Sequence, residues 1–186
     1  EQRDLLRELI EDVYSVSGDT AALLRSLPED LSPEREAVVR TACSLVGKVN
    51  YFWGGKSLVI GWDARWGELR QVTAAGNSTT DTYRPYGLDC SGFVDWVFYN
   101  ATNGSYIIGH GGGATAQHSY CTDIPWANAQ PGDLVFYPDN SHVGIIGGRD
   151  ANGELLVIHC ASGYNNVVIT GKEGFTSISR PRYYAE

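Results

Sequence analysis

The 186-residue sequence contains no methionine and has few basic side chains for its length. Its 14 lysines and arginines stand against 22 aspartates and glutamates, so the formal net charge is -8. A protein this acidic repels the phosphate backbone, and we therefore expect no nucleic-acid partner. Because the chain starts at Glu1 and not at a methionine, we expect a processed or trimmed piece of a longer protein, which leaves room for a removed signal peptide or additional domains.

Long hydrophobic runs are also absent. No apolar stretch approaches the length that spans a bilayer, and the longest ones resemble core strands. The hydrophobic fraction of 42% is still enough for one full-sized domain with a core. The sequence therefore predicts a folded domain with no membrane span in this chain.

Cysteine is scarce, with residues only at positions 43, 90, 121 and 160. They form no C-x-x-C pair and no zinc-ribbon spacing, so the usual sequence evidence for a structural zinc site is missing. Four cysteines are too few for a scaffold built on disulfides, although one pair can be bridged and the sequence does not choose which.

The first third of the chain has helical periodicity. Apolar residues recur at helical spacing in two stretches before residue 28, at Leu5, Leu6, Leu9, Ile10 and Val13 and again over 20–27. Ser32 followed by Pro33 is typical of a helix start, and a helix is predicted from Pro33 to about Val46. We therefore divide the chain into an N-terminal helical extension, 1–32, and a main domain, 33–186.

The middle of the chain alternates loops with one buried helix. Residues 56–89 are polar and aperiodic, but Trp62 and Trp66 predict an ordered loop or lid, since tryptophans rarely stay in water. The run "CSGFVDWVFYN" from Cys90 is apolar almost all round, which is typical of a central buried helix. The glycine-rich segment 109–118 is predicted to be loop and turn.

The second half reads as strands. Short β-branched runs, "GDLVFYP", "HVGIIGG", "ELLVIHCAS" and "NVVIT", are separated by turn sequences, and Asn152-Gly153 indicates a hairpin. Helices followed by a meander of strands predict an α+β fold with an antiparallel sheet.

Cys90 has four interpretations from sequence: a buried small hydrophobe, half of a disulfide, a metal ligand or a nucleophile. It stands where the buried helix is predicted to begin. Unpaired N–H groups and the helix dipole at that end favour a thiolate, and the same groups can hold an oxyanion. The position therefore suits a nucleophile, although most cysteines at helix starts are structural.

Two histidines on neighbouring predicted strands supply a base for that nucleophile. His142 opens the strand "HVGIIGG" and His159 lies near the end of "LLVIH". Across the hairpin the rings can face one another, so that His142 takes the proton of Cys90 and His159 orients the His142 ring. A lone histidine at a strand end is usually only a polar surface residue, but the combination is rarer than either histidine alone.

Other clusters of polar residues give weaker evidence for a functional site. His110, His118 and Cys121 have the spacing H-x7-H-x2-C, which matches no usual ligand pattern, so we expect no metal. Asp95 is expected to face solvent or make a polar contact. Asp89, directly before Cys90, is either a simple N-cap of the helix or a group that binds a substrate cation.

The ordered motifs "YFWGG", "DCSGF", "GGGATAQ", "QPGDLVFY", "HVGIIGG" and "VIHCAS" resemble the NlpC/P60 family. These proteins are papain-like cysteine peptidases of bacterial cell-wall metabolism, and the resemblance extends from about Pro33 to the C-terminus. It implies a papain-like fold, with the catalytic helix packed on the antiparallel sheet, and makes 33–186 the catalytic domain.

The resemblance also implies roles for individual residues. The nucleophile of the family falls on Cys90, the base on His142 and the third, polar catalytic residue on His159. Tyr51, Asp89 and Ser91 would line the pocket for the amino end of the substrate, where Asp89 would pair with a free amine. No metal or organic cofactor is implied.

The activity implied is hydrolysis of peptidoglycan stem peptides outside the cell or at its wall, typically at the γ-D-glutamyl bond to meso-diaminopimelate or lysine. One departure from the family is the long segment 56–89, expected to border the cleft, where Trp62, Trp66, Asp63 and Arg65 would shape which muropeptides enter. For the two tryptophans, packing against the domain is the favoured alternative. Cys160 is expected to be structural, and a bridge to Cys121 is one pairing left open.

Three rival functions remain beside the endopeptidase. They are a CHAP-like amidase that cuts between the glycan and L-alanine, an acyltransferase using the same thiol, and a catalytically silent domain that binds cell-wall peptides. Tyr51 and Asp89 argue against the first two. The joint presence of Cys90, His142 and His159 argues against the third.

Overall fold

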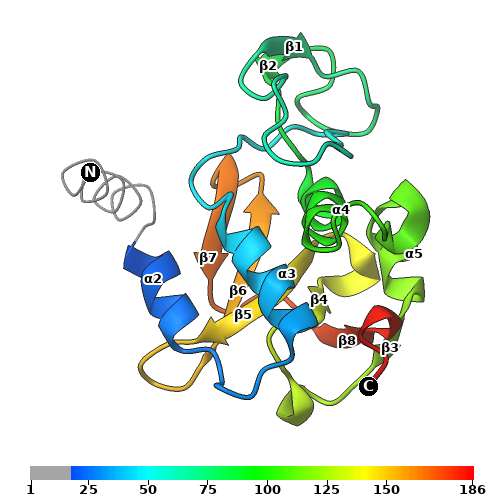
Figure 1. The fold of residues 1–186 in the computed structure, drawn as a ribbon. Helices are drawn as coiled ribbons and strands as arrows, with labels where there is room; N and C mark the ends of the chain where they lie inside the picture. Colours follow the sequence, from blue (N-terminus) through cyan, green and yellow to red (C-terminus); the bar gives the residue numbers. More distant parts are fainter. Residues whose placement is uncertain (1–17) are drawn as a thin grey trace, which may run out of the picture.

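A computed structural model describes residues 18–186, so the helix predicted around Leu5 to Val13 lies outside the described residues (Figure 1). The helices are α2 (Gly18–Arg25), α3 (Pro33–Cys43), α4 (Cys90–Ala101) and α5 (Gly113–Ser119). The strands are β1 (Leu69–Gln71), β2 (Tyr83–Pro85), β3 (Cys121–Asp123), β4 (Leu134–Phe136), β5 (Val143–Arg149), β6 (Leu155–Ala161), β7 (Asn166–Thr170) and β8 (Ser177–Pro181). Short 3-10 helices cover Ile108–Gly111, Trp126–Asn128, Pro138–Asn140 and Arg182–Tyr184.

Six of these strands form one sheet in the order β3-β8-β4-β5-β6-β7, and every neighbouring pair is antiparallel. The predicted hairpin at Asn152-Gly153 is confirmed as the β5–β6 connection, where Gly153 has a φ of 80°. Helices α3 and α4 lie side by side across one face of the sheet (Figure 1). The predicted α+β fold is therefore confirmed.

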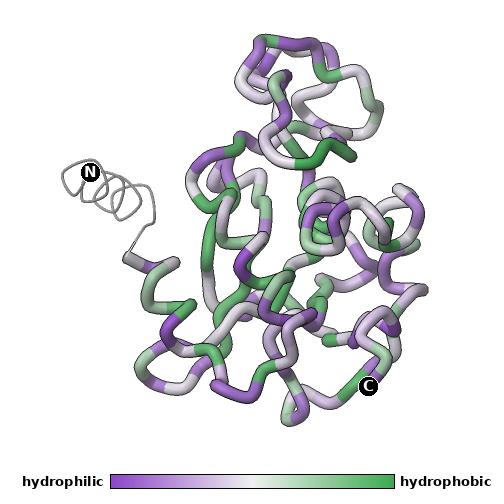
Figure 2. The backbone as a smooth tube through the Cα atoms, in the orientation of Figure 1, coloured by the Kyte–Doolittle hydropathy of each residue, from purple (hydrophilic) through white to green (hydrophobic). Residues whose placement is uncertain are grey.

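Helix α4 forms the centre of the core. Phe93, Val94, Val97 and Phe98 are fully buried between the sheet and α3. Figure 2 shows hydrophobic residues gathered where the helices meet the sheet, with hydrophilic residues toward the outside. Because side chains alternate along a strand, Val135, Val157 and Ile178 point to the other face and build a second, smaller cluster there.

The start of α3 follows the prediction. The Ser32 hydroxyl accepts a hydrogen bond from the Arg35 backbone N–H at 3.3 Å, and Pro33 occupies the first turn. The helix ends at Cys43, earlier than predicted, and turns fill the remaining residues to Gly47. Leu23 of α2 is fully buried and packs on β5 beside Gly147 and Gly148, so the described part of 1–32 joins the same core. The boundary at 32/33 stays a prediction.

Residues 56–89 form an ordered excursion that carries the β1–β2 hairpin and rises beyond α4 (Figure 1). Trp66 is buried and lies 5.8 Å, centroid to centroid, from Trp96 of α4. Trp62 packs edge-on against Trp66 but is 54% exposed. The expectation that tryptophan avoids water is therefore correct for Trp66 and wrong for Trp62.

Two further expectations are wrong. Part of the glycine-rich segment is helical, as the 3-10 turn at Ile108–Gly111 and as α5; glycine suits Gly109 because a Cβ there would collide with the Gln117 backbone. All four cysteines are free, so Cys160 is not bridged to Cys121. Their thiols instead contact the backbone carbonyls of Leu88 and Gln117, respectively. Within residues 18–186 no helix is long and apolar enough to cross a membrane.

Candidate active site

Helix α4 begins at Cys90 because Asp89 caps it. One carboxylate oxygen of Asp89 accepts the Gly92 backbone N–H at 2.8 Å, and the other accepts the Gly54 N–H at 3.1 Å. A Cβ on Gly92 would overlap the Gly55 carbonyl oxygen, so the glycine allows the "WGG" loop to cross the helix start at close range. Local sequence thus fixes both the position of the thiol and the loop beside it.

The Cys90 sulfur faces two backbone N–H groups, those of Ser91 and Val143, which favour its anionic form. Val143 directly follows His142, so the start of β5 lies at the thiol. Burial nevertheless raises the pKa of Cys90 to about 11, with a smaller contribution from the Asp89 carboxylate. The raised pKa favours the protonated thiol at rest, which differs from the expected thiolate, because desolvation outweighs the two backbone N–H groups that stabilise the anion.

His142 and His159 face one another as predicted. The His142 Nε2 atom lies 2.7 Å from the His159 Nδ1 atom. Phe175 packs against both rings and Tyr137 against His142, which removes water from the pair. This burial lowers the pKa of His142 to about 4, and burial together with nearby His142 lowers that of His159 to about 3. Both imidazoles are neutral near pH 7.

Thr170 decides which nitrogen of each ring carries the proton. Its hydroxyl donates to the Gly171 carbonyl at 2.8 Å, so toward His159 Nε2, also at 2.8 Å, it acts as an acceptor. His159 therefore holds its proton on Nε2, and its bare Nδ1 accepts the Nε2–H of His142. The Nδ1 atom of His142 is left as the basic nitrogen of the pair. Sequence reasoning missed Thr170, since a threonine in "NVVIT" looks like an ordinary strand residue.

Tyr51, Asp89 and Ser91 also lie around Cys90. Tyr51 forms an isolated bridge with Leu88, and burial raises the pKa of its phenol, with Cys90 and Asp89 adding to the shift. The sequence reasoning missed Lys56, whose ammonium donates at 2.8 Å both to Asp89 Oδ1 and to the Ser91 hydroxyl. The spacing to Asp89 conceals this contact, because only the folded loop brings the two together.

Of the two alternatives expected for Asp95, exposure to solvent or a polar contact, the structure shows the polar contact. Asp95 is 3% exposed and accepts a hydrogen bond from the Gln117 side-chain amide at 2.8 Å. The same amide group donates to the Ser91 carbonyl, so Gln117 of α5 holds the first turn of α4 in place. Burial raises the pKa of Asp95 to about 6. The carboxyl is the only acid on α4.

The histidines that the sequence placed near Cys121 do not gather with it. His118 bonds to Asn140 and Asp123 and stacks on Phe136, while His110 packs against Tyr120. Across residues 18–186, no three His, Cys, Asp or Glu side chains come together as a metal site.

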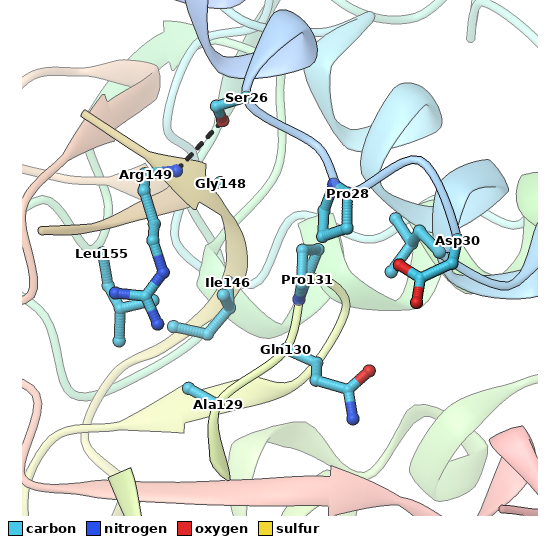
Figure 3. Close-up of a pocket in the computed structure, with 11 residues that line it drawn as sticks. Ser26, Pro28, Asp30, Ala129, Gln130, Pro131, Ile146, Gly148, Arg149 and Leu155 are labelled. Atoms are coloured by element: carbon cyan, nitrogen blue, oxygen red, sulfur yellow. Dashed lines mark hydrogen bonds between the residues drawn. The ribbon is translucent and has the colours of Figure 1, made fainter. Parts of the chain in front are cut away.

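A cavity of about 190 Å³ lies elsewhere, between the α2–α3 connection and β5 (Figure 3). Ser26, Pro28, Gln130 and Arg149 are among its lining residues, and the Ser26 hydroxyl accepts the Arg149 backbone N–H. None of the predicted site residues lines this cavity. It is therefore separate from the thiol and the histidines.

Curated proteins resemble the chain over different shares of its length. A probable endopeptidase of Mycobacterium tuberculosis is 32% identical over 140 residues, which is 73% of this chain but 26% of that protein. The probable endopeptidase p60 of Listeria seeligeri is 36% identical over 72 residues, 39% of this chain and 13% of that protein. The chain thus spans about a quarter, or less, of the length of these relatives.

Solved structures agree on the fold. The peptidoglycan hydrolase RipB of Mycobacterium tuberculosis is 27% identical with a TM-score of 0.55, over 95% of this chain and 79% of that chain. RipD of the same organism, described as a non-catalytic NlpC/P60 domain protein adapted to peptidoglycan binding, is 18% identical with a TM-score of 0.57, over 81% of this chain and 98% of that one. A family profile described as the NlpC/P60 family matches residues 47–176. With most of its length matched, the chain belongs to the NlpC/P60 family.

Proposed function

We propose that the protein is an exported cysteine endopeptidase that hydrolyses peptidoglycan stem peptides through an acyl-enzyme on Cys90. The bond we propose is the γ-D-glutamyl bond to diaminopimelate or lysine. The observation that carries the proposal is the directed chain from Gly171 through Thr170 and His159 to His142, which leaves a basic nitrogen on the residue before Val143, whose N–H faces the Cys90 sulfur. A protein that only binds peptide has no need for this proton order.

The chemistry begins with a neutral thiol and a neutral imidazole. Cys90 Sγ attacks the γ-carbonyl carbon while its proton passes to His142 Nδ1, so an S–C bond forms as the S–H bond breaks. His159 stabilises the resulting imidazolium through the Nε2–H bond. The oxyanion lies at the N-terminus of α4, where the Cys90 backbone N–H supplies part of its stabilisation.

Collapse of this intermediate breaks the C–N bond, and His142 donates its proton to the leaving amine. Water then attacks the thioester carbonyl as His142 accepts one of its protons. The S–C bond breaks, the carboxylic acid leaves, and the proton returns to Cys90. The sequence of steps needs protons from the thiol and water only, and every transfer runs through His142.

The substrate class is supported by the relatives. Curated relatives are named probable endopeptidases, and solved relatives are described as peptidoglycan hydrolases. A peptidoglycan substrate also places the protein outside the cell or at its wall. The non-catalytic description of RipD supports a rival, a domain that binds cell-wall peptides without cutting them.

Digestion of purified muropeptides with identification of the new ends by mass spectrometry tests the proposal. We expect a new carboxyl end at D-glutamate and a new amino end at diaminopimelate or lysine. A cut between the lactyl group and L-alanine would instead support the amidase. Binding of muropeptides without any cleavage, across several peptidoglycan types, would support the silent binding domain.

A further inference from the structure

The Lys56 ammonium occupies the space between the residues on either side of Cys90. It donates to Asp89 Oδ1 and to the Ser91 hydroxyl, each at 2.8 Å. Lys56 directly follows the Gly54–Gly55 turn that crosses the start of α4. The turn that donates to the Asp89 carboxylate through the Gly54 N–H therefore also positions the Lys56 ammonium beside that carboxylate.

With Lys56 in place, the Asp89 carboxylate is already paired with a cation and hydrogen-bonded. Oδ1 accepts from the Gly92 N–H, the Lys56 ammonium and, at 3.4 Å, the Ser91 hydroxyl, while Oδ2 accepts from the Gly54 N–H. Three of these donors converge on Oδ1 and one on Oδ2, so the oxygen that Lys56 binds has no acceptor position left. The charge is paired as well as hydrogen-bonded.

The pair is placed to influence a substrate. The Asp89 side chain is 9% exposed, so the ion pair is screened less than one on the open surface. The Lys56 side chain is 39% exposed, so it is far more accessible than the carboxylate that it binds. A substrate ammonium at Asp89 Oδ1 would lie beside the Lys56 ammonium, and like charges at that range repel.

We propose that Lys56 determines substrate choice by filling the place of a substrate amine at Asp89 and Ser91. The cleft then accepts stem peptides whose first amino-acid nitrogen is acylated, as in peptide still joined to its glycan, and discriminates against peptides with a free amino end. This inference rests on the proposed function. It replaces the expectation that Asp89 itself pairs with the free amine of the substrate.

The proposal differs from a purely structural ion pair in what it predicts. If the pair only braces the loop, removing Lys56 lowers activity on every substrate by a similar factor. If Lys56 selects the substrate, removing it leaves Asp89 as an unpaired carboxylate that attracts a free amine, and the ratio between two substrates changes. The ratio of the activities on the two substrates is therefore the decisive quantity, because a loss of activity that affects both substrates equally leaves this ratio unchanged.

The test uses one stem tripeptide, L-Ala-γ-D-Glu linked to diaminopimelate or lysine, with its amino end either free or acetylated. The kcat/KM of both peptides is measured for wild type, Lys56→Gln and Lys48→Gln. Lys48 is exposed, so its replacement removes the same charge elsewhere on the surface. Binding of the same peptides to the Cys90→Ala protein, with and without Lys56→Gln, is measured by calorimetry.

We expect wild type and Lys48→Gln to favour the acetylated peptide, and Lys56→Gln to shift the ratio toward the free amine by about tenfold or more, the scale of a charged hydrogen bond. A ratio unchanged by Lys56→Gln, or a wild type that favours the free amine, overturns the proposal. Absence of cleavage in every variant overturns the proposed function instead. In that case the ratio of the two binding affinities still tests the role of Lys56. The Lys56 proposal is overturned if Lys56→Gln leaves that ratio unchanged, or if neither peptide binds.

Discussion

The His142 Nε2 atom lies 2.7 Å from the His159 Nδ1 atom, and this contact has a direction. Thr170 accepts a hydrogen bond from His159 and donates one to the Gly171 carbonyl, so each hydrogen bond from His142 to Gly171 has a single direction. The Nδ1 atom of His142 is therefore held unprotonated without any charged orienting group. Neutral groups suit this site, because Phe175 and Tyr137 exclude the water that a charged orienter would need.

Thr170→Val keeps the shape of the side chain but removes the hydroxyl that fixes the His159 proton. We expect kcat to fall roughly tenfold to hundredfold, a part of what a general base contributes, with little change in KM. Steady-state kinetics on a stem peptide measures this split.

Thr170→Ser is the matched control, since it restores the hydroxyl and should recover most of the activity. If Thr170→Val and wild type have the same kcat, the proton order at His142 does not depend on Thr170.

The pH dependence of kcat/KM follows from the resting protonation states. Activity requires a neutral His142, whose pKa is lowered by burial to about 4, and a thiol whose pKa is raised by burial to about 11. We expect a broad plateau between these values, with the acid limb well below the ordinary histidine pKa of about 6.5. An acid limb near 6.5, measured on a substrate without titrating groups in that range, would show that His142 is solvated.

Stability should fall as the solution becomes acidic. The folded-state pKa values of His142 and His159 are lowered, so below about 6.5 the unfolded chain binds protons that the folded protein refuses. Each histidine adds up to about 1.4 kcal/mol of lost stability per pH unit until its folded pKa is reached. Denaturant unfolding at a series of pH values should give a flatter acid slope for His159→Gln than for wild type.

Asp95 contributes to the pH dependence of stability with the opposite sign and therefore provides the control for the histidines. Its folded-state pKa is raised to about 6, so its contribution to stability grows as the pH falls through 6 toward the unfolded value. Asp95→Asn removes this compensation and should steepen the acid slope. Equal slopes for wild type, His159→Gln and Asp95→Asn would contradict the burial of these groups.

The close approach at Gly92 predicts a large effect from a single methyl group. Gly92→Ala places a Cβ on the Gly55 carbonyl oxygen, so the "WGG" loop or the helix start has to move. We expect a loss of more than about 2 kcal/mol in the free energy of unfolding. Gly163→Ala is the control, since a Cβ there meets nothing within 4 Å; similar losses for both variants would argue against the contact.

The sequence predicted elements wherever the pattern was local. The Ser32 cap, the apolar helix after Cys90 and the hairpin at Asn152-Gly153 each depend on a few adjacent residues, and all are present. The strands around His142 and His159 were predicted as well, which is why their meeting across the β5–β6 pair was foreseen.

Long-range contacts explain what the sequence did not reveal. Most of helix α5 lies within the glycine-rich segment, where Gly109 is needed for close approach to the Gln117 backbone rather than for a loop. Lys56, Gln117 and Thr170 enter the site through hydrogen bonds between distant segments. The raised pKa of the Cys90 thiol was not foreseen because its burial depends on the whole fold, whereas the helix dipole could be inferred from position alone.

The rate of stem-peptide hydrolysis by Cys90→Ala tests the central claim most directly, with Cys43→Ala as the control. Cys43 is another free cysteine, but it is buried in α3 and takes no part in the proposed chemistry. We predict that Cys90→Ala lowers the rate by at least about 10³-fold while Cys43→Ala remains active. A Cys90→Ala protein that cleaves the γ-D-glutamyl bond at the wild-type rate would contradict the account.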